Sequence, residues 1–216
     1  MSYGRGATEL LARRIASGLA RLSLAIKAQS WRGAADDNIT PTQGEVLARL
    51  AEHPDGLRLG ELARQLDVSA PTASAVVAVL VVKGLAASKQ GKDRRAVRLR
   101  ITRKGKAVAA RASDWTGFLA DSIDTLPISE QAAFLSSLVK IIRAMQEQGD
   151  IPVQRMCVTC DHFRPFAHSD SANPHHCNFV DAAFGQPALR LNCADHLAGD
   201  RDGQASVWQR FISDGA

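Results

Sequence analysis

The spacing of hydrophobic residues predicts two short helices joined by a tight turn near the middle of the chain. Leu59, Leu62 and Leu66 recur at the three- to four-residue interval of one helical face. A second helix is expected from about Ala70, because Ser69 is a good N-cap. Its inward face is expected to comprise Ala73, Val76, Val77, Leu80 and Val81. Two such helices form a helix-turn-helix unit, whose second helix can enter a DNA major groove.

A change of hydrophobic period after this second helix predicts a β-hairpin. Gly84 is placed to end the helix in a left-handed conformation. Val97, Leu99 and Ile101 then follow the two-residue period of a half-buried strand. Residues 85–90 can supply the paired strand, and the polar residues between the two form the turn.

The hairpin and its flanks are strongly basic. Ten lysines and arginines and a single acid, Asp93, lie between Lys83 and Lys106. Such dense positive charge repels itself unless a polyanion is nearby, which indicates contact with phosphate. The longest apolar run, Ala75 to Val82, is less than half of the roughly 20 residues that a membrane span needs. No signal-peptide pattern opens the chain, so we expect a cytoplasmic protein without membrane contact.

Apolar periodicity also predicts helices on both sides of this region. One is expected from Thr8 to about Gln29, and a capping-box pattern at Thr40 and Gln43 begins another. After the hairpin, a long helix is expected over residues 102–127.

A further helix is expected from Ser129, and its apolar face is too wide for a contact within one monomer. That face comprises Phe134, Leu135, Leu138, Ile141, Ile142 and Met145. We therefore expect two subunits to share this surface. A dimer would place two recognition helices about one DNA turn apart, ~34 Å, on a palindromic operator.

Several short motifs follow one another in a distinctive order between residues 8 and 148. They are Thr40-Pro41-Thr42-Gln43, Glu61-Leu62-Ala63, Lys83-Gly84-Leu85, Asp93-Arg94-Arg95 and Ile101-Thr102-Arg103-Lys104-Gly105. In this combination the chain resembles the MarR family of winged helix-turn-helix regulators. The resemblance implies a homodimer that binds double-stranded DNA and regulates transcription, with repression as the expected role. It also implies a small-molecule effector bound near the dimer helices, although no residue identifies one.

The residues expected to contact DNA lie in the second helix of the motif and in the wing. They are Ser69, Thr72, Ser74 and Ala75 in the helix, and Lys92, Arg94, Arg95 and Arg98 in the wing. By the resemblance, Arg94 and Arg95 reach the adjacent minor groove or its phosphates. The helix residues are short, and none is an Arg, Asn or Gln that could make a bidentate base contact. We therefore expect thymine methyl groups and DNA shape to contribute much of the specificity.

Beyond Gly149 the composition changes abruptly. All four cysteines and five of the six histidines lie between Cys157 and His196. The spacing is Cys157-x2-Cys160, then sixteen residues to Cys177 and fifteen more to Cys193. Cytoplasmic thiols stay reduced, so these cysteines are expected to be metal ligands rather than disulfides. We expect the metal to supply folding energy that such a loop-rich segment cannot obtain from a core.

Two ligand sets and two kinds of metal fit this spacing. The ligands are the four cysteines, or three of them together with His176 or His196. Zinc is the expected cofactor, and four thiolates also suit an iron–sulfur cluster that would sense iron or redox state. The spacing does not separate these alternatives, nor a structural role from a sensory one.

The expected fold is mainly α with a small β-hairpin wing, followed by a short, loop-rich, metal-stabilised C-terminal segment. We divide the chain into an N-terminal dimerisation helix (1–36), a winged helix-turn-helix (37–104), C-terminal dimerisation helices (105–149) and a metal-binding extension (150–216). The alternative to a regulator is a metal-binding protein-interaction module with secondary DNA contact. The sequence contains no nucleophile elbow, Gly-rich phosphate loop or paired acids, so an enzyme is not expected.

Overall fold

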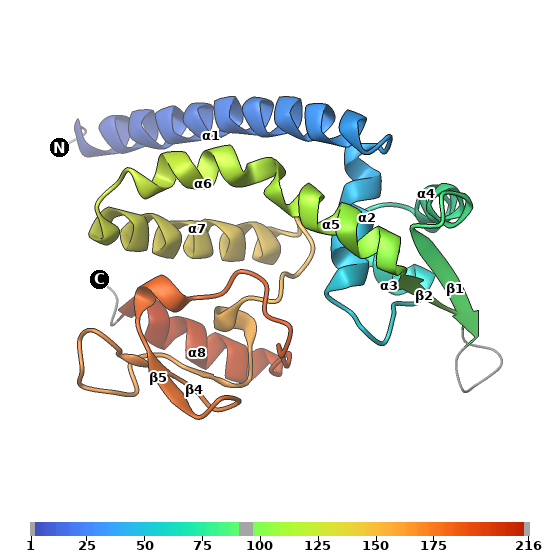
Figure 1. Ribbon diagram of the computed structural model, residues 1–216. Coiled ribbons are helices and arrows are strands. Elements are labelled where there is room, and N and C mark those ends of the chain that lie inside the picture. The colour runs from blue at the N-terminus through green and yellow to red at the C-terminus, as the bar shows by residue number, and fades with distance from the viewer. Residues whose placement is uncertain (1–2, 91–96, 214–216) are drawn as a thin grey trace. The chain divides into compact units, whose positions relative to one another are not determined.

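The computed structural model describes residues 3–90 and 97–213, with side chains for residues 10–88 and 97–213. The chain forms two compact units, Met1–Ser122 and Ile123–Ala216 (Figure 1). Each unit has its own hydrophobic core. The finer division into four segments stays a prediction.

The first unit contains helices and one two-stranded antiparallel sheet. Its elements are α1 (Tyr3–Asp36), α2 (Pro41–Ala51), α3 (Leu59–Gln65), α4 (Ala70–Val82), β1 (Ala86–Gln90), β2 (Val97–Ile101), α5 (Arg103–Ser113), the 3₁₀ helix η1 (Asp114–Thr116) and α6 (Gly117–Asp124), the last of which runs into the second unit. This order of helices and hairpin confirms the predicted winged helix-turn-helix.

Helices α3 and α4 form the helix-turn-helix, and α4 begins where the sequence predicts. Ser69 Oγ accepts a hydrogen bond from the backbone N–H of Thr72 at 3.2 Å and so caps α4. Gly84 ends the motif with a φ of +69°, as predicted. The predicted inward face of α4 is largely confirmed, because Ala73, Val77 and Leu80 are buried and Val76 is half-buried. Val81 is the exception, because it lines an open groove with Leu59 and Val97.

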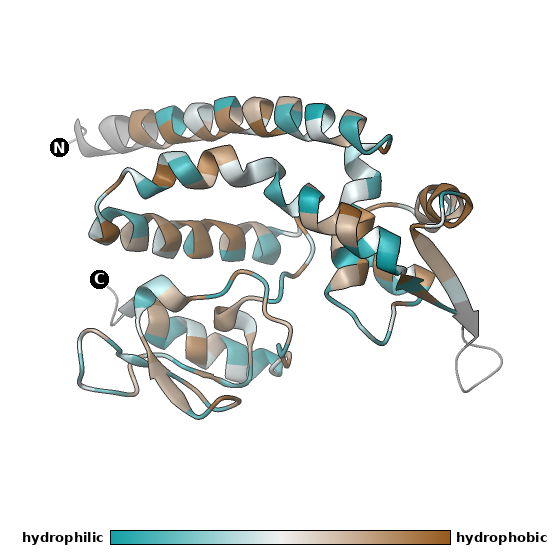
Figure 2. Ribbon diagram, viewed as in Figure 1, coloured by the Kyte–Doolittle hydropathy of each residue, from teal (hydrophilic) through white to brown (hydrophobic). Residues whose placement is uncertain are grey.

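The composition of α4 is unusually apolar, as its colour in Figure 2 shows. Helices α3 and α4 together reach the length and hydropathy of a membrane span, but they are bent by 108° relative to each other. No single helix in the described part of the chain is long and apolar enough to span a membrane.

The wing is attached to the rest of the unit by backbone hydrogen bonds. Strands β1 and β2 pair antiparallel from Ala86 opposite Ile101 to Gln90 opposite Val97. Leu57 and Leu99 also exchange a pair of N–H···O bonds of 3.0 and 2.8 Å, which join β2 to the segment before α3. The wing turn, residues 91–96, lies outside the described residues.

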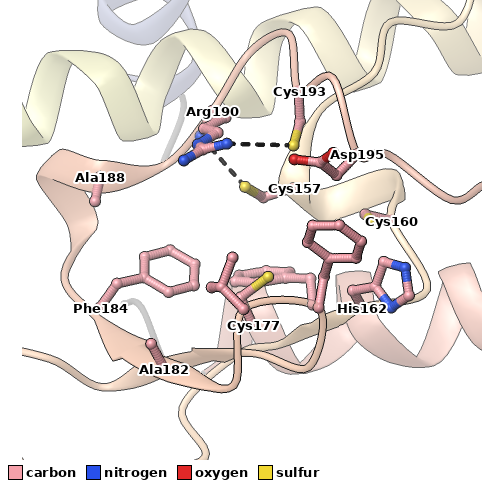
Figure 3. Close-up of a pocket in the computed structure, with 13 residues that line it drawn as sticks. Cys157, Cys160, His162, Cys177, Ala182, Phe184, Ala188, Arg190, Cys193 and Asp195 are labelled. Atoms are coloured by element: carbon pink, nitrogen blue, oxygen red, sulfur yellow. Dashed lines mark hydrogen bonds between the residues drawn. The ribbon is translucent and has the colours of Figure 1, made fainter.

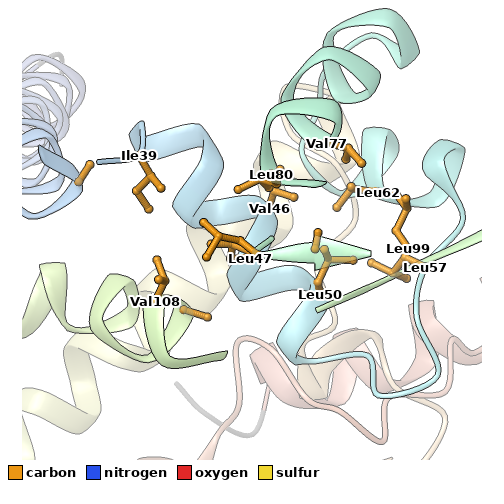
Figure 4. Packing of buried hydrophobic residues seen from close by; sticks show 14 residues of the cluster. Ile39, Val46, Leu47, Leu50, Leu57, Leu62, Val77, Leu80, Leu99 and Val108 are labelled. Carbon is orange, nitrogen blue, oxygen red and sulfur yellow. The ribbon is translucent and has the colours of Figure 1, made fainter. Parts of the chain in front are cut away.

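The core of the first unit is aliphatic and lies where α2, α3, α4, the wing and α5 meet (Figure 4). Its largest members are Ile39, Val46, Leu47, Leu50, Leu57, Leu62, Val77, Leu80, Leu99 and Val108. The predicted capping box orients α2 over this core, because Gln43 N donates to Thr40 Oγ1 and Thr40 N donates to Gln43 Oε1.

Two helices of this unit differ from the prediction. Helix α1 continues to Asp36 rather than ending near Gln29. The helix expected over residues 102–127 is interrupted at η1, where Trp115 packs against Gly33 and Gly44. A Cβ at those glycines would lie 2.2 and 2.4 Å from the indole, so only glycine admits the ring. The break turns Trp115 onto α1 and α2, which a straight helix need not do.

The second unit combines two helices with a small sheet. Its elements are α7 (Ile128–Gln148), the 3₁₀ helix η2 (Cys157–Thr159), β3 (Phe163–Arg164), β4 (His175–Cys177), β5 (Ala182–Phe184), the 3₁₀ helix η3 (Gln186–Ala188) and α8 (Arg201–Ser213). The strands form an antiparallel sheet in the order β3-β4-β5. Helix α8 has 13 residues.

The second unit has a core of its own, so the expectation that only a metal could hold this segment is not supported. Its buried members are Val139, Met156, Val158, Cys160, Phe163, Leu189 and Phe211. Leu135 and Ile142 of α7 pack against them. Part of the α7 face that the sequence assigns to a dimer interface therefore covers the C-terminal segment, while Ile141 and Met145 stay exposed.

Candidate nucleic-acid interface and cysteine cluster

The start of α4 presents an exposed face without charge. Ser69, Thr72, Ser74 and Ala75, the four predicted base-contacting residues, are all exposed. The Ser69 and Thr72 hydroxyl oxygens lie 2.8 Å apart and share a hydrogen bond. Farther along the helix Val82 is 88% exposed. Such a surface can contact thymine methyl groups and the sugar–phosphate backbone, but it cannot make bidentate contacts to guanine.

The basic residues near α4 that the structure describes are partly engaged within the protein. Arg98 Nη1 donates a 2.7 Å hydrogen bond to the Gly56 carbonyl, which ties β2 to the loop after α2. Lys83 Nζ donates to Gln43 Oε1 at 3.2 Å and to the Asn38 carbonyl. The sequence pattern of the wing does not predict this hydrogen bond between Arg98 and Gly56. The contact of Arg98 with phosphate stays a prediction. Lys92, Arg94 and Arg95 lie outside the described residues.

The four cysteines converge on one cavity in the second unit. They are free thiols and line a cavity of about 140 Å³ (Figure 3). Cys157 begins η2 and Cys160 follows it, Cys177 ends β4, and Cys193 lies in the loop after η3. The 3.0 Å hydrogen bond from Cys157 N to the Arg190 carbonyl and the 2.9 Å bond from Cys193 N to the Arg155 carbonyl hold two of these segments together.

Nitrogen donors surround the sulfur atoms. The backbone N–H of Arg190 donates to Cys157 Sγ at 3.3 Å, and its guanidinium Nη1 donates to Cys193 Sγ at 3.6 Å. The backbone N–H of Leu197 donates to Cys160 Sγ at 3.5 Å. Hydrogen bonds of this kind stabilise sulfur that carries negative charge.

Electrostatic coupling also shows that the thiols are close together. Burial raises the pKa of the Cys157 thiol, the backbone N–H of Arg190 opposes that rise, and the charges of Cys193, Cys160 and Cys177 add to it. The hydrogen bond to Cys193, followed by the charge of that residue, raises the pKa of Arg190. Arg190 therefore stays a cation beside a group of thiols that can become anionic.

The histidines of the alternative ligand set lie away from this cavity. His176 Nδ1 lies 3.2 Å from His168 Nε2, and His176 Nε2 lies 3.3 Å from Asp181 Oδ1. His196 Nε2 is 2.9 Å from Thr159 Oγ1. Neither lines the cavity, whereas His162 does. Successive strand residues point to opposite faces, which explains why Cys177 faces the cavity and the adjacent His176 does not.

Sequence reasoning missed several residues of this site. Arg190 and Asp195 line the cavity together with the rings of Phe163, Phe179 and Phe184. Arg190 could have been noticed only as a basic residue three positions before Cys193. Among the described residues, no three His, Cys, Asp or Glu side chains are close enough to hold a single metal ion as they stand.

Comparisons with known proteins bear on the first unit. Residues 37–96 match the model of the MarR family. The matched segment covers the winged helix-turn-helix, so the similarity applies to that part of the chain. Proteins of that family are transcription regulators, in agreement with the prediction of a regulator rather than an enzyme. A comparison with curated protein sequences finds no match.

Solved structures of the MarR type share this fold. A MarR family protein from Bacillus stearothermophilus is 23% identical, with a TM-score of 0.56 over 64% of this chain and 97% of its own. S. aureus MepR in complex with DNA is 22% identical, with a TM-score of 0.52 over 60% of this chain and 96% of its own. The transcriptional repressor CouR, bound to a 23-mer DNA duplex, is 28% identical, with a TM-score of 0.51 over 61% of this chain and 94% of its own. Nearly all of each neighbour is matched, so the remainder of this chain has no counterpart in them.

Proposed function

We propose that this chain is a cytoplasmic, homodimeric repressor that reads a palindromic operator with α4 and the wing. The observation that carries the proposal is the exposed, uncharged face of α4 within a winged helix-turn-helix. The similarity to CouR, a repressor bound to a DNA duplex, supports it. The ten basic residues between Lys83 and Lys106 would supply the phosphate contacts.

Helix α1 supports the homodimer. It spans 34 residues, about 51 Å at the usual helical rise. Within the first unit it packs against α2, α5 and η1. Its exposed apolar side chains are Leu10, Leu11, Ile15, Leu22, Leu24 and Trp31. An apolar surface of this extent on one helix is typical of a subunit interface, and a second copy of the chain would cover it.

We further propose that the four cysteines of the second unit bind a metal centre, either zinc or an iron–sulfur cluster, for stability or for sensing. The cavity favours the all-cysteine set over the sets that include His176 or His196, because all four cysteines line it and neither of these histidines does. A small-molecule effector stays a prediction. The interaction-module alternative is weaker, because it gives the winged helix no leading role.

Fluorescence anisotropy tests DNA binding directly. The full chain is titrated into labelled DNA from upstream of its own gene and into a shuffled duplex of equal composition. Ser74→Glu places a carboxylate on the exposed face of α4, and we expect it to weaken specific binding by at least about tenfold through repulsion of phosphate. Ser171→Glu adds the same charge at an exposed position of the second unit and should leave affinity unchanged. Equal affinity of the wild-type chain for both duplexes would contradict the proposal.

A further inference from the structure

The arrangement of the four thiols identifies the kind of metal centre they suit. A single tetrahedral zinc holds each sulfur at about 2.3 Å, which places neighbouring sulfurs roughly 3.8 Å apart with no cavity between them. Here all four cysteines line one cavity of about 140 Å³ (Figure 3). A cavity of roughly that volume admits a molecule the size of benzene. The site is therefore much larger than one zinc ion requires.

The spacing of possible ligands leads to the same conclusion. In the part of the chain that the structure describes, no group of three His, Cys, Asp or Glu residues is close enough for one metal ion. The four cysteines nevertheless line one cavity. In an iron–sulfur cluster each cysteine can bind a different iron, so the sulfurs stand around the cluster rather than around one atom.

The walls of the cavity suit a cluster with net negative charge. The Arg190 guanidinium lies beside Cys193, and two backbone N–H groups point at Cys157 and Cys160. Hydrogen bonds to sulfur and nearby charge are among the features that tune iron–sulfur centres. Apolar side chains complete the wall, among them Phe163, Phe179, Val180 and Phe184.

We infer that Cys157, Cys160, Cys177 and Cys193 bind an iron–sulfur cluster, most simply a cubane of four irons and four sulfides, and not a single zinc ion. This inference rests on the metal centre proposed above and names its chemical class. It also assigns Arg190 as a positioning residue that donates to two of the four ligand sulfurs.

The test uses the full chain, expressed with iron and cysteine supplied and purified without oxygen. Iron, zinc and acid-labile sulfide are measured per chain, together with the visible absorption spectrum before and after dithionite. We expect about four irons and four sulfides per chain and a brown colour that bleaches on reduction. About two of each also supports a cluster. One zinc without sulfide would overturn this inference but preserve the metal centre, and absence of bound metal would overturn both.

Matched variants assign the ligands. Cys177→Ser should lose at least about nine-tenths of the iron and sulfide, because the fourth ligand is removed. His176→Ala, at the next position of the same strand, should retain both, because its side chain does not line the cavity. Circular dichroism and DNA binding are measured on each variant, so that loss of the fold or of the regulator function is recognised separately. Full iron and sulfide in Cys177→Ser, or their loss in His176→Ala alone, would contradict the assignment.

Discussion

The two units of this chain differ in how their cores are built. The first packs aliphatic side chains from helices and a hairpin, and the hydrophobic period of the sequence predicts these elements. The second packs aromatic rings, a methionine and a cysteine from short strands and loops around α7 and α8. The difference shows that a chemically rich site can occupy a unit that also has a conventional core. In such a unit stability does not have to come from a metal centre alone.

The strongest test of this comparison removes the aromatic anchor of the second core. Phe211 is buried and packs near Phe163 and Trp208. Phe211→Ala should lower the free energy of unfolding of this unit by roughly 3–5 kcal/mol, because it leaves a large cavity. Urea unfolding followed by near-ultraviolet circular dichroism measures the change. Val153→Ala, at an exposed position, is the control. A negligible effect of Phe211→Ala, together with complete unfolding by a chelator, would show that metal alone holds the unit.

The aliphatic core of the first unit can be tested in the same way. Leu47 is fully buried, so Leu47→Ala should cost roughly 2–5 kcal/mol in the free energy of unfolding. It should also weaken DNA binding when the folded fraction falls. Val82→Ala removes an exposed side chain and should change the free energy by less than about 0.5 kcal/mol. Equal effects of the two substitutions would show that α2 is not central to the core.

A glycine pair tests the packing between the wing and α5. A Cβ at Gly105 would lie 2.0 Å from the Leu85 carbonyl oxygen, so Gly105→Ala should destabilise the first unit by roughly 1–3 kcal/mol. Nothing lies within 4 Å of a Cβ at Gly60 in α3, so Gly60→Ala should stabilise the first unit by up to about 1 kcal/mol. Thermal unfolding measures whether each substitution lowers or raises the melting temperature. If both variants have a higher melting temperature than the wild-type chain, α5 does not approach the wing as closely as described.

The smallest predicted effect concerns Arg98, for which the sequence and the structure give different roles. Arg98→Ala removes the hydrogen bond to the Gly56 carbonyl and should cost about 1 kcal/mol of stability. If bracing is its only role, the salt dependence of DNA binding should not change. A decrease of about one unit in the slope of log affinity against log salt would instead show the phosphate contact that the sequence predicts.

Much of the first unit could be predicted from sequence because local signals agree with one another. Ser69, Thr40 and Gly84 each occupy the cap position that the local pattern assigns them. The interruption at η1 could not be predicted, because it depends on Trp115 meeting Gly33 and Gly44, which lie far away in the sequence. Helical periodicity carries no information about such a distant contact.

In the second unit the sequence singled out the four cysteines that line one cavity, but not the residues around them. The clustering of Cys157, Cys160, Cys177 and Cys193 indicates a metal centre from spacing alone. Spacing left zinc and a cluster open, because it carries no information about the volume of the cavity that the cysteines line. The core around Phe211 was missed as well, since its members come from short strands, loops and helix ends that show no repeated period.

Footprinting of the full chain on its upstream DNA tests the central claim most directly. Hydroxyl-radical cleavage reports which sugars the bound protein covers on each strand. A homodimer with two recognition helices should protect two symmetric half-sites whose centres are about one helical turn, roughly 10 base pairs, apart. Protection of one half-site, or uniform protection without sequence preference, would contradict the account of a paired winged-helix repressor.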